Sequence, residues 1–326
     1  MGYFEIIKEG VRIANRNLAV LLTQFLAGLA MVLAFFVLFA AFLIMALGSL
    51  PGLTLGNFSA DELSGLVEKS ITLIAGGFFL VLVFVIFAAF LTSFVHSGNL
   101  GCVIETARGR AAGFTSGTFF GTGRRSMLSM LGLYIIFGLI ALGGLVVIAS
   151  AAGVGLGGVL IPLKEAGKGL VAFGLGVPFI IALILAGLLF LYFLYAGWAF
   201  SGVILVGEAR GPLSSLSAAY NFIRKHFWDS LLFALLMFLL VFIANVITSV
   251  LGVPFGIDSE RPALALGLMP LLLLNVLVQM YVGLVARSSF VVYYLLRSNP
   301  PAPPAVSEAP PVQPVAETPP LNFPRP

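Results

Sequence analysis

The stretch Ser97–Gly109 reads SGNLGCVIETARG, and Ser201–Gly211 repeats its pattern as SGVILVGEARG about a hundred residues later. Each copy closes a long apolar run and carries an acid just before Ala-Arg-Gly. A reduced third copy, without the acid, follows at Arg287-Ser288-Ser289. Self-similarity at a fixed period is typical of a repeated structural unit. We therefore expect three repeats, at about 1–104, 105–207 and 208–298.

Composition identifies the repeated unit as a membrane hairpin. Hydrophobic residues make up 60% of the chain and charged residues 9%, and the mean hydropathy is +1.12, whereas soluble proteins carry about 25% charged residues. Each apolar run exceeds the roughly 20 residues that cross a bilayer; the runs lie near 18–48, 71–95, 127–152, 170–204, 229–253 and 264–296. The sequence predicts an all-α polytopic membrane protein with six transmembrane helices, arranged as three helical-hairpin repeats in a domain over 1–298.

Basic residues indicate the orientation. Twelve of the 17 Lys and Arg residues lie in four segments, 1–17, 104–126, 207–228 and 297–326. Because basic loops stay on the cytoplasmic side, we expect both termini to be cytoplasmic, in a bacterial inner membrane. The pI near 9.3 then favours anionic lipid headgroups as partners and argues against nucleic acid.

Polar stretches precede the hairpins. Phe4–Asn17 and Pro212–Trp228 place apolar residues at helical spacing with charged residues between them, which is typical of amphipathic helices lying in the headgroup plane. The stretch 110–126 is a poorer helix because it contains four glycines. The hairpins are thus expected to carry interfacial stretches on the cytoplasmic side.

The end of the chain, 299–326, holds 11 of the 18 prolines. Such a segment forms neither a helix nor a sheet strand, so we expect a disordered cytoplasmic tail with polyproline II character. A spacer or tether is the simpler interpretation. Docking of a protein partner is the alternative, although PxxP spacing is expected by chance in so proline-rich a segment.

The acids of the repeated pattern, Glu105 and Glu208, lie beside Arg108 and Arg210. We interpret these residues as helix-end charge pairs, each worth about 0–1 kcal/mol when exposed. The alternative is a ring of acids and bases around a cytoplasmic entrance. The third copy, which lacks the acid, argues against such a symmetric ring.

Polar residues inside the apolar runs are the candidates for a cavity: Asn245, Asn275, Gln279 and Arg287. Asn275 and Gln279 are four residues apart and therefore share a helix face. Polar groups at membrane depth face the bundle interior or a wet cavity. Hydrogen bonds between helices are the simpler explanation for the amides, but Arg287 carries a permanent charge that needs a partner or access to the interface.

Recognised catalytic patterns are absent from the sequence. It contains no glycine-rich phosphate loop, no His-Glu-x-x-His and no Gly-x-Ser-x-Gly, and its two histidines have no metal-ligand spacing. We therefore expect no enzymatic activity, no cofactor and no metal.

The repeated Ser-Gly…Glu-(Thr)-Ala-Arg-Gly pattern, followed by a basic amphipathic stretch and another apolar helix, resembles a group of prokaryotic six-helix membrane proteins. That group is similar to the membrane domain attached to some glycerophosphodiester phosphodiesterases. The resemblance covers about 1–298 and rests on small residues and helix-end charges. It implies membrane topology and a link to lipid biology, and it carries over no catalytic residue, because in the fused enzymes hydrolysis belongs to a separate soluble barrel.

The sequence is compatible with two functions. One is a non-enzymatic scaffold or accessory protein of the cytoplasmic membrane, with a tail that tethers partners. The other is a transporter or lipid-handling protein that uses a polar intramembrane cavity. Many transporters are built from internal repeats, but usually from inverted ones, whereas here each repeat begins on the same side. The sequence leaves the ligand and the oligomeric state open.

Overall fold

The computed structural model describes residues 2–49, 60–167, 169–252 and 262–298, and every element in these ranges is helical. In chain order the elements are α1 (Tyr3–Arg16), α2 (Ala19–Ser49), α3 (Ala60–Ala107), α4 (Ser116–Ala152), the π-helix η1 (Gly153–Leu160), α5 (Ile161–Glu165), α6 (Gly169–Gly207), α7 (Pro212–Lys225), α8 (Phe227–Gly252) and α9 (Pro262–Ser298). Six helices are long and apolar enough to cross a membrane. The predicted all-α polytopic fold is confirmed, while the predicted tail at 299–326 lies outside the described residues.

The six long helices pair in chain order as α2–α3, α4–α6 and α8–α9. The glycine-rich segment that follows α4 is mostly helical: η1 continues α4, α5 follows, and the chain turns at Gly167, where φ is +74°. Glycine disfavours helices in water. In an apolar environment, however, the backbone must satisfy its own hydrogen bonds, which explains the long helical hairpin.

Two of the three predicted amphipathic stretches form separate helices, α1 and α7. The stretch 110–126 does not, because α4 begins within it. The hydroxyl of Thr115 accepts a hydrogen bond from the Thr118 amide at 3.3 Å, and such a cap starts a helix that then runs without a break into the apolar segment. The first turns of α4 pack against α3.

The returning helices α3, α6 and α9 contact one another in pairs and form the centre of a compact base. Ser97, Ser201 and Ser288, which belong to the three copies of the pattern, are fully buried there. Gly98 shows how tight this packing is, since a β-carbon at that position would lie 2.7 Å from the ring of Phe119. Small residues therefore let these helices approach closely, as in other membrane bundles.

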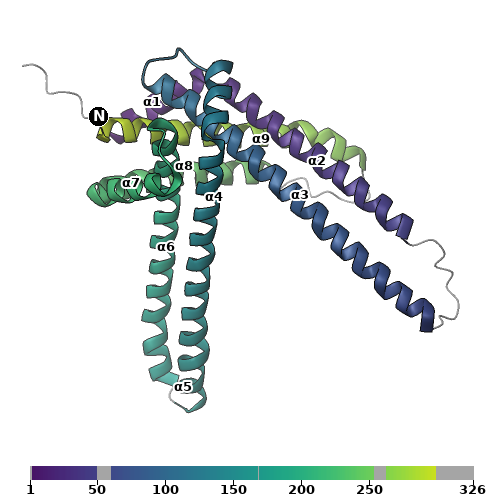
Figure 1. Ribbon diagram of the computed structural model, residues 1–326. Coiled ribbons are helices and arrows are strands. Elements are labelled where there is room, and N and C mark those ends of the chain that lie inside the picture. The colour runs from purple at the N-terminus through teal and green to yellow at the C-terminus, as the bar shows by residue number, and fades with distance from the viewer. Residues whose placement is uncertain (1, 50–59, 168, 253–261, 299–326) are drawn as a thin grey trace, which may run out of the picture.

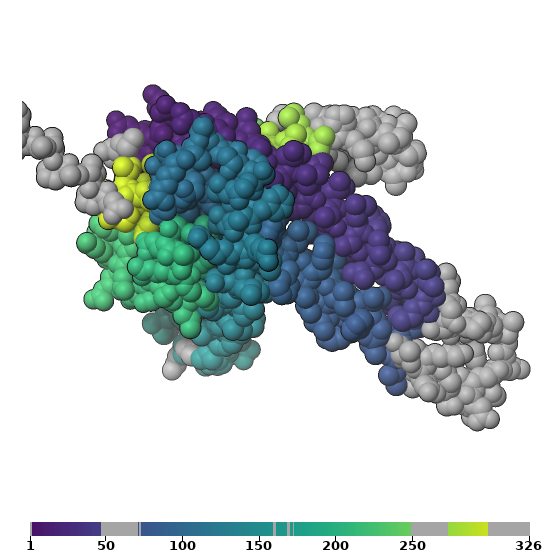
Figure 2. Space-filling view, turned by 45° about the horizontal axis from the view of Figure 1, so that its top comes forward, coloured from purple at the N-terminus to yellow at the C-terminus, as the bar shows by residue number. Residues whose placement is uncertain are grey.

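Beyond the base, the hairpins separate. Figure 1 shows the α2–α3 hairpin and the α4–α6 hairpin leaving the base in different directions, and Figure 2 shows the α2–α3 arm projecting from the body of the molecule. The arms expose large apolar side chains, such as Phe78 (70%) and Phe173 (74%). This surface suits hydrocarbon rather than water.

Candidate functional site

The helix-end charges lie at the base: Glu105 is in the last turn of α3, and the other charged residues lie just beyond the ends of α3 and α6. Glu105 lies 3.7 Å from Arg108 and 3.6 Å from Arg110, and Glu208 lies 2.8 Å from Arg210. All five side chains are partly exposed, so each pair contributes about 0–1 kcal/mol. Their main effect is to hold the turns that follow the two helices.

Further contacts from the same residues tie the three returning helices together. Arg108 Nη2 donates to the carbonyl of Gly207 at 3.0 Å and so joins the end of α3 to the end of α6. The hydroxyl of Tyr294 on α9 donates to Glu208. These side chains are engaged in joining helices, which supports a packing role for them.

The three predicted amides form hydrogen bonds within their own helices. Asn245 donates to the carbonyl of Val241 in its own helix at 2.9 Å, and Gln279 donates to Asn275 at 3.0 Å along α9. The side chains of Asn245 and Gln279 are exposed. Among the described residues, Asn245 forms no hydrogen bond with Asn275 or Gln279.

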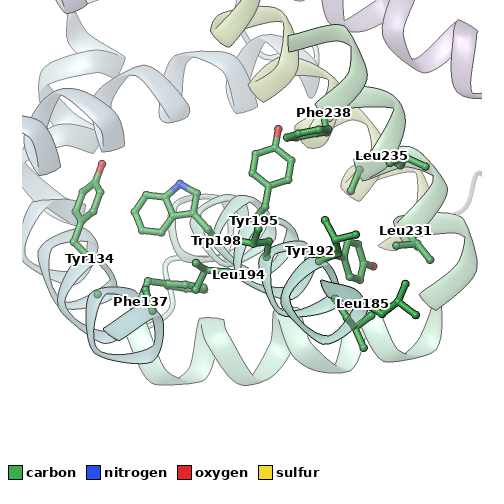
Figure 3. A pocket seen from close by; sticks show the side chains of 16 residues that line it. Tyr134, Phe137, Leu185, Tyr192, Leu194, Tyr195, Trp198, Leu231, Leu235 and Phe238 are labelled. Atoms are coloured by element: carbon green, nitrogen blue, oxygen red, sulfur yellow. The ribbon is translucent and has the colours of Figure 1, made fainter. Parts of the chain in front are cut away.

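A cavity lies between α4, α6 and α8, with a volume of about 870 Å³ (Figure 3). This size is within the range of small-molecule pockets. The lining is almost entirely apolar, and several of its side chains are exposed, including Leu188 (58%), Leu235 (59%) and Phe238 (58%). The space is therefore a lateral groove that opens towards the lipid side of the helices rather than an enclosed chamber.

One end of the groove is aromatic. Tyr134 and Trp198 contact each other with ring centroids 4.5 Å apart, and His96 of α3 lies 6.1 Å from Tyr134 and 5.7 Å from Trp198. Figure 3 shows the polar atoms of Tyr134, Trp198 and Tyr195 directed to the same side of the view. The groove thus has an apolar body and a polar end.

Arg287 of α9, the fourth predicted cavity residue, is not among the residues that line the groove. Its charge interacts with Tyr134, Tyr195 and His96. The side chain is partly buried. Among the described residues it forms no hydrogen bond or ion pair, and no described carboxylate is close enough to interact with its charge.

The sequence interpretation missed the aromatic residues of the groove. Tyr192, Tyr195 and Trp198 follow one another at intervals of three within an apolar run, and this spacing places them along one face of α6. Side chains with an apolar body and a polar tip are enriched where an apolar region meets a polar one. The spacing of these three aromatic residues was therefore the sequence feature that could have indicated the groove, whereas the prediction relied on the amides of α9.

A metal site is absent from the described parts of the chain, where no group of three or more His, Cys, Asp or Glu side chains gathers. No protein-family model, curated protein or solved structure matches the chain. The geometry of the groove is therefore the basis for inferring a function.

Proposed function

We propose that this integral membrane protein is a non-enzymatic lipid-handling protein that holds a membrane lipid in the groove between α4, α6 and α8. The observation that carries the proposal is the shape of this space, a lateral apolar groove with a polar aromatic end. An amphiphile has the same two parts. The proposal agrees with the link to lipid biology that the resemblance to phosphodiesterase membrane domains implies.

The groove is suited to lipid rather than to a water-soluble ligand. Its exposed leucines and phenylalanine face the region that hydrocarbon occupies around the arms. An acyl chain therefore reaches it by lateral diffusion, without crossing a polar barrier. A transporter of polar solutes needs a wet, polar path through the bundle, and the apolar lining of this groove does not supply one.

Photo-crosslinking tests the proposal. The protein is placed in membranes that contain a phospholipid with a diazirine on one acyl chain, and the crosslinked peptides are identified by mass spectrometry. We expect crosslinks to concentrate on the facing segments of α6 and α8 that line the groove, around Tyr195 and Leu235. Crosslinks spread evenly over all exposed helix faces would contradict the proposal.

A matched pair of glycine variants sharpens this test. Gly138 lines the groove and has open space beside it, and Gly143, on the same helix, also has open space but does not line the groove. Gly138→Phe fills the groove without a clash at the β-carbon, whereas Gly143→Phe adds the same side chain elsewhere. We expect Gly138→Phe to remove the α6 and α8 crosslinks and Gly143→Phe to keep them.

A scaffold role is a second proposal, supported by basic residues on the base. Arg124, Arg125, Arg224 and Lys225 are exposed and, among the described residues, form no ion pair. Changing these four to Gln is expected, under this proposal, to remove protein–protein crosslinks in the native membrane while leaving the lipid crosslinks of the groove unchanged. Unchanged protein crosslinks would contradict it.

A further inference from the structure

Arg287 carries a charge that no described residue neutralises. It lies in α9 within the apolar segment Leu273–Ser298 and is partly buried. A charge in such a position is costly unless a partner or a polar cavity accompanies it. No described acid neutralises it, and the titratable groups that interact with its charge are the phenols of Tyr134 and Tyr195 and the imidazole of His96.

The neighbours of Arg287 share its lack of partners. The hydroxyls of Tyr134 and Tyr195 and the indole nitrogen of Trp198 form no hydrogen bond with any described residue. The Tyr134 hydroxyl and the Trp198 nitrogen are not among the fully buried polar atoms that lack partners, and the Tyr195 side chain is 36% exposed. These groups therefore border open space. Figure 3 shows them directed to the same side. A guanidinium, an indole N–H and two phenols together offer donors to an anion.

The side chains that carry the free hydrogen-bond donors also form part of the wall of the apolar groove. Tyr134, Tyr195 and Trp198 line the groove and form its polar end. Tyr195 also contacts Phe290 of α9, with ring centroids 5.6 Å apart, three residues after Arg287. A ligand that fills both parts therefore has an anionic group a short distance from a hydrocarbon chain. Guanidinium groups bind phosphate oxygens through paired hydrogen bonds, which makes a phosphate ester the best match for the polar end.

The charges around Arg287 favour an anionic lipid over a zwitterionic one. A zwitterionic headgroup brings an ammonium beside its phosphate, and the described residues around Arg287 include no carboxylate to receive it. An anionic headgroup brings a net negative charge that offsets the arginine. We propose that the groove selectively binds an anionic glycerophospholipid, with its phosphate at Arg287, Tyr134, Tyr195 and Trp198 and its acyl chain along α6 and α8. This inference rests on the proposed function.

Native mass spectrometry of the protein released from nanodiscs tests the selectivity. The nanodiscs contain equal amounts of phosphatidylglycerol and phosphatidylcholine. We expect the wild type to retain phosphatidylglycerol over phosphatidylcholine by a factor on the order of ten, and Arg287→Gln to retain the two equally. Since Arg287 has no described ion-pair partner, the substitution breaks no pair and the variant is expected to fold.

Two controls separate this inference from the proposed function. The double variant Arg124→Gln/Arg125→Gln removes exposed surface charge, and we expect it to keep the preference for phosphatidylglycerol. If this double variant loses the preference while Arg287→Gln keeps it, the inference is overturned. Gly138→Phe is expected to lose the retained lipid of either kind. If it retains lipid like the wild type, the proposed function fails. If it loses lipid but wild type and Arg287→Gln show the same preference, only the anionic selectivity fails.

A thermal measurement gives an independent readout. The unfolding midpoint of the wild type is expected to be higher in phosphatidylglycerol nanodiscs than in phosphatidylcholine nanodiscs, because a ligand that binds only the folded state stabilises it. Arg287→Gln is expected to lose this difference while still unfolding cooperatively. A difference of the same size in both proteins overturns the assignment of Arg287.

Discussion

Substituting Gly10 with alanine tests the contact that fixes α1 on α9. Gly10 is buried, and a β-carbon built on it would lie 2.1 Å from Ser289 Oγ and 2.9 Å from Ser289 Cα. The first contact is relieved by rotating a side chain. The second involves backbone, so the two helices must move apart.

The expected magnitude follows from three terms. Overpacking a close contact costs about 1–3 kcal/mol. Rotating Ser289 breaks its hydrogen bond to the carbonyl of Val285, which is 2.8 Å long and is worth about 0.5–1.5 kcal/mol. Alanine in place of glycine stabilises a helix by about 1 kcal/mol. We therefore expect Gly10→Ala to lower the free energy of unfolding by about 0.5–3.5 kcal/mol.

Denaturation in mixed detergent–SDS micelles, followed by circular dichroism, measures this change. Gly28→Ala is the matched control, because Gly28 lies in α2 and a β-carbon added there would meet nothing within 4 Å, so the protein should gain up to about 1 kcal/mol there. Hydrogen exchange of the α1 amides should also accelerate in Gly10→Ala alone. Equal stability of the two variants would refute the packing of α1 on α9 described above.

Three further predictions concern the base and the hairpin tips. Asp229 accepts a hydrogen bond from Tyr3 at 3.3 Å and pairs with Arg297 at 2.8 Å. In Asp229→Asn we expect the free energy of unfolding to fall by about 1 kcal/mol in the same SDS titration, and the N-terminal segment to be proteolysed faster. An unchanged unfolding midpoint would argue against this link between α1, α8 and α9. Burial, followed by the charges of Arg297 and Lys225, lowers the pKa of His226 below its usual value. The folded state therefore binds the proton less tightly than the unfolded state, and stability should fall as the pH drops below about 6.5; His226→Gln should remove that part of the pH dependence of the unfolding midpoint. Ala166 is exposed at the tip of the α4–α6 hairpin, so Ala166→Cys in a chain without its native cysteine should react with a membrane-impermeant thiol reagent in intact cells, and labelling only after permeabilisation would reverse the proposed orientation.

The membrane-spanning helices were predictable because their signal is local. An apolar run of sufficient length identifies a transmembrane helix without knowledge of its neighbours. The amphipathic stretch at Phe4–Asn17 was likewise visible, and α1 spans Tyr3–Arg16. Local propensity misled at 110–126, where glycines indicated a poor helix, and the glycine-rich segment 153–167 contains the same helix-disfavouring residues. In the structure, a cap at Thr115 and the need to satisfy backbone groups in an apolar environment keep both segments helical over most of their length.

The candidate site was less predictable because it depends on which helices face each other. Polarity within the apolar runs drew attention to Asn275 and Gln279, yet these two side chains bond to each other along one helix. The groove is formed by apolar residues of α4, α6 and α8, whose proximity no single-helix pattern encodes. Arg287 was identified from the sequence as a charge in need of a partner. That its neighbours would be phenols and an indole rather than an acid required the structure.

The divergence of the hairpins explains why a groove exists at all. Leucine gains little by leaving lipid for another helix, so aliphatic arms have no strong reason to close on each other, and small buried residues such as Ser201 and Gly98 hold only the base together. Hydrocarbon will therefore lie between α6 and α8 whatever the function. What distinguishes a binding site from ordinary contact with bulk lipid is a feature that discriminates among headgroups. Arg287 and its unpaired neighbours are the described residues placed to do so, and for this reason selectivity rather than occupancy is the decisive measurement.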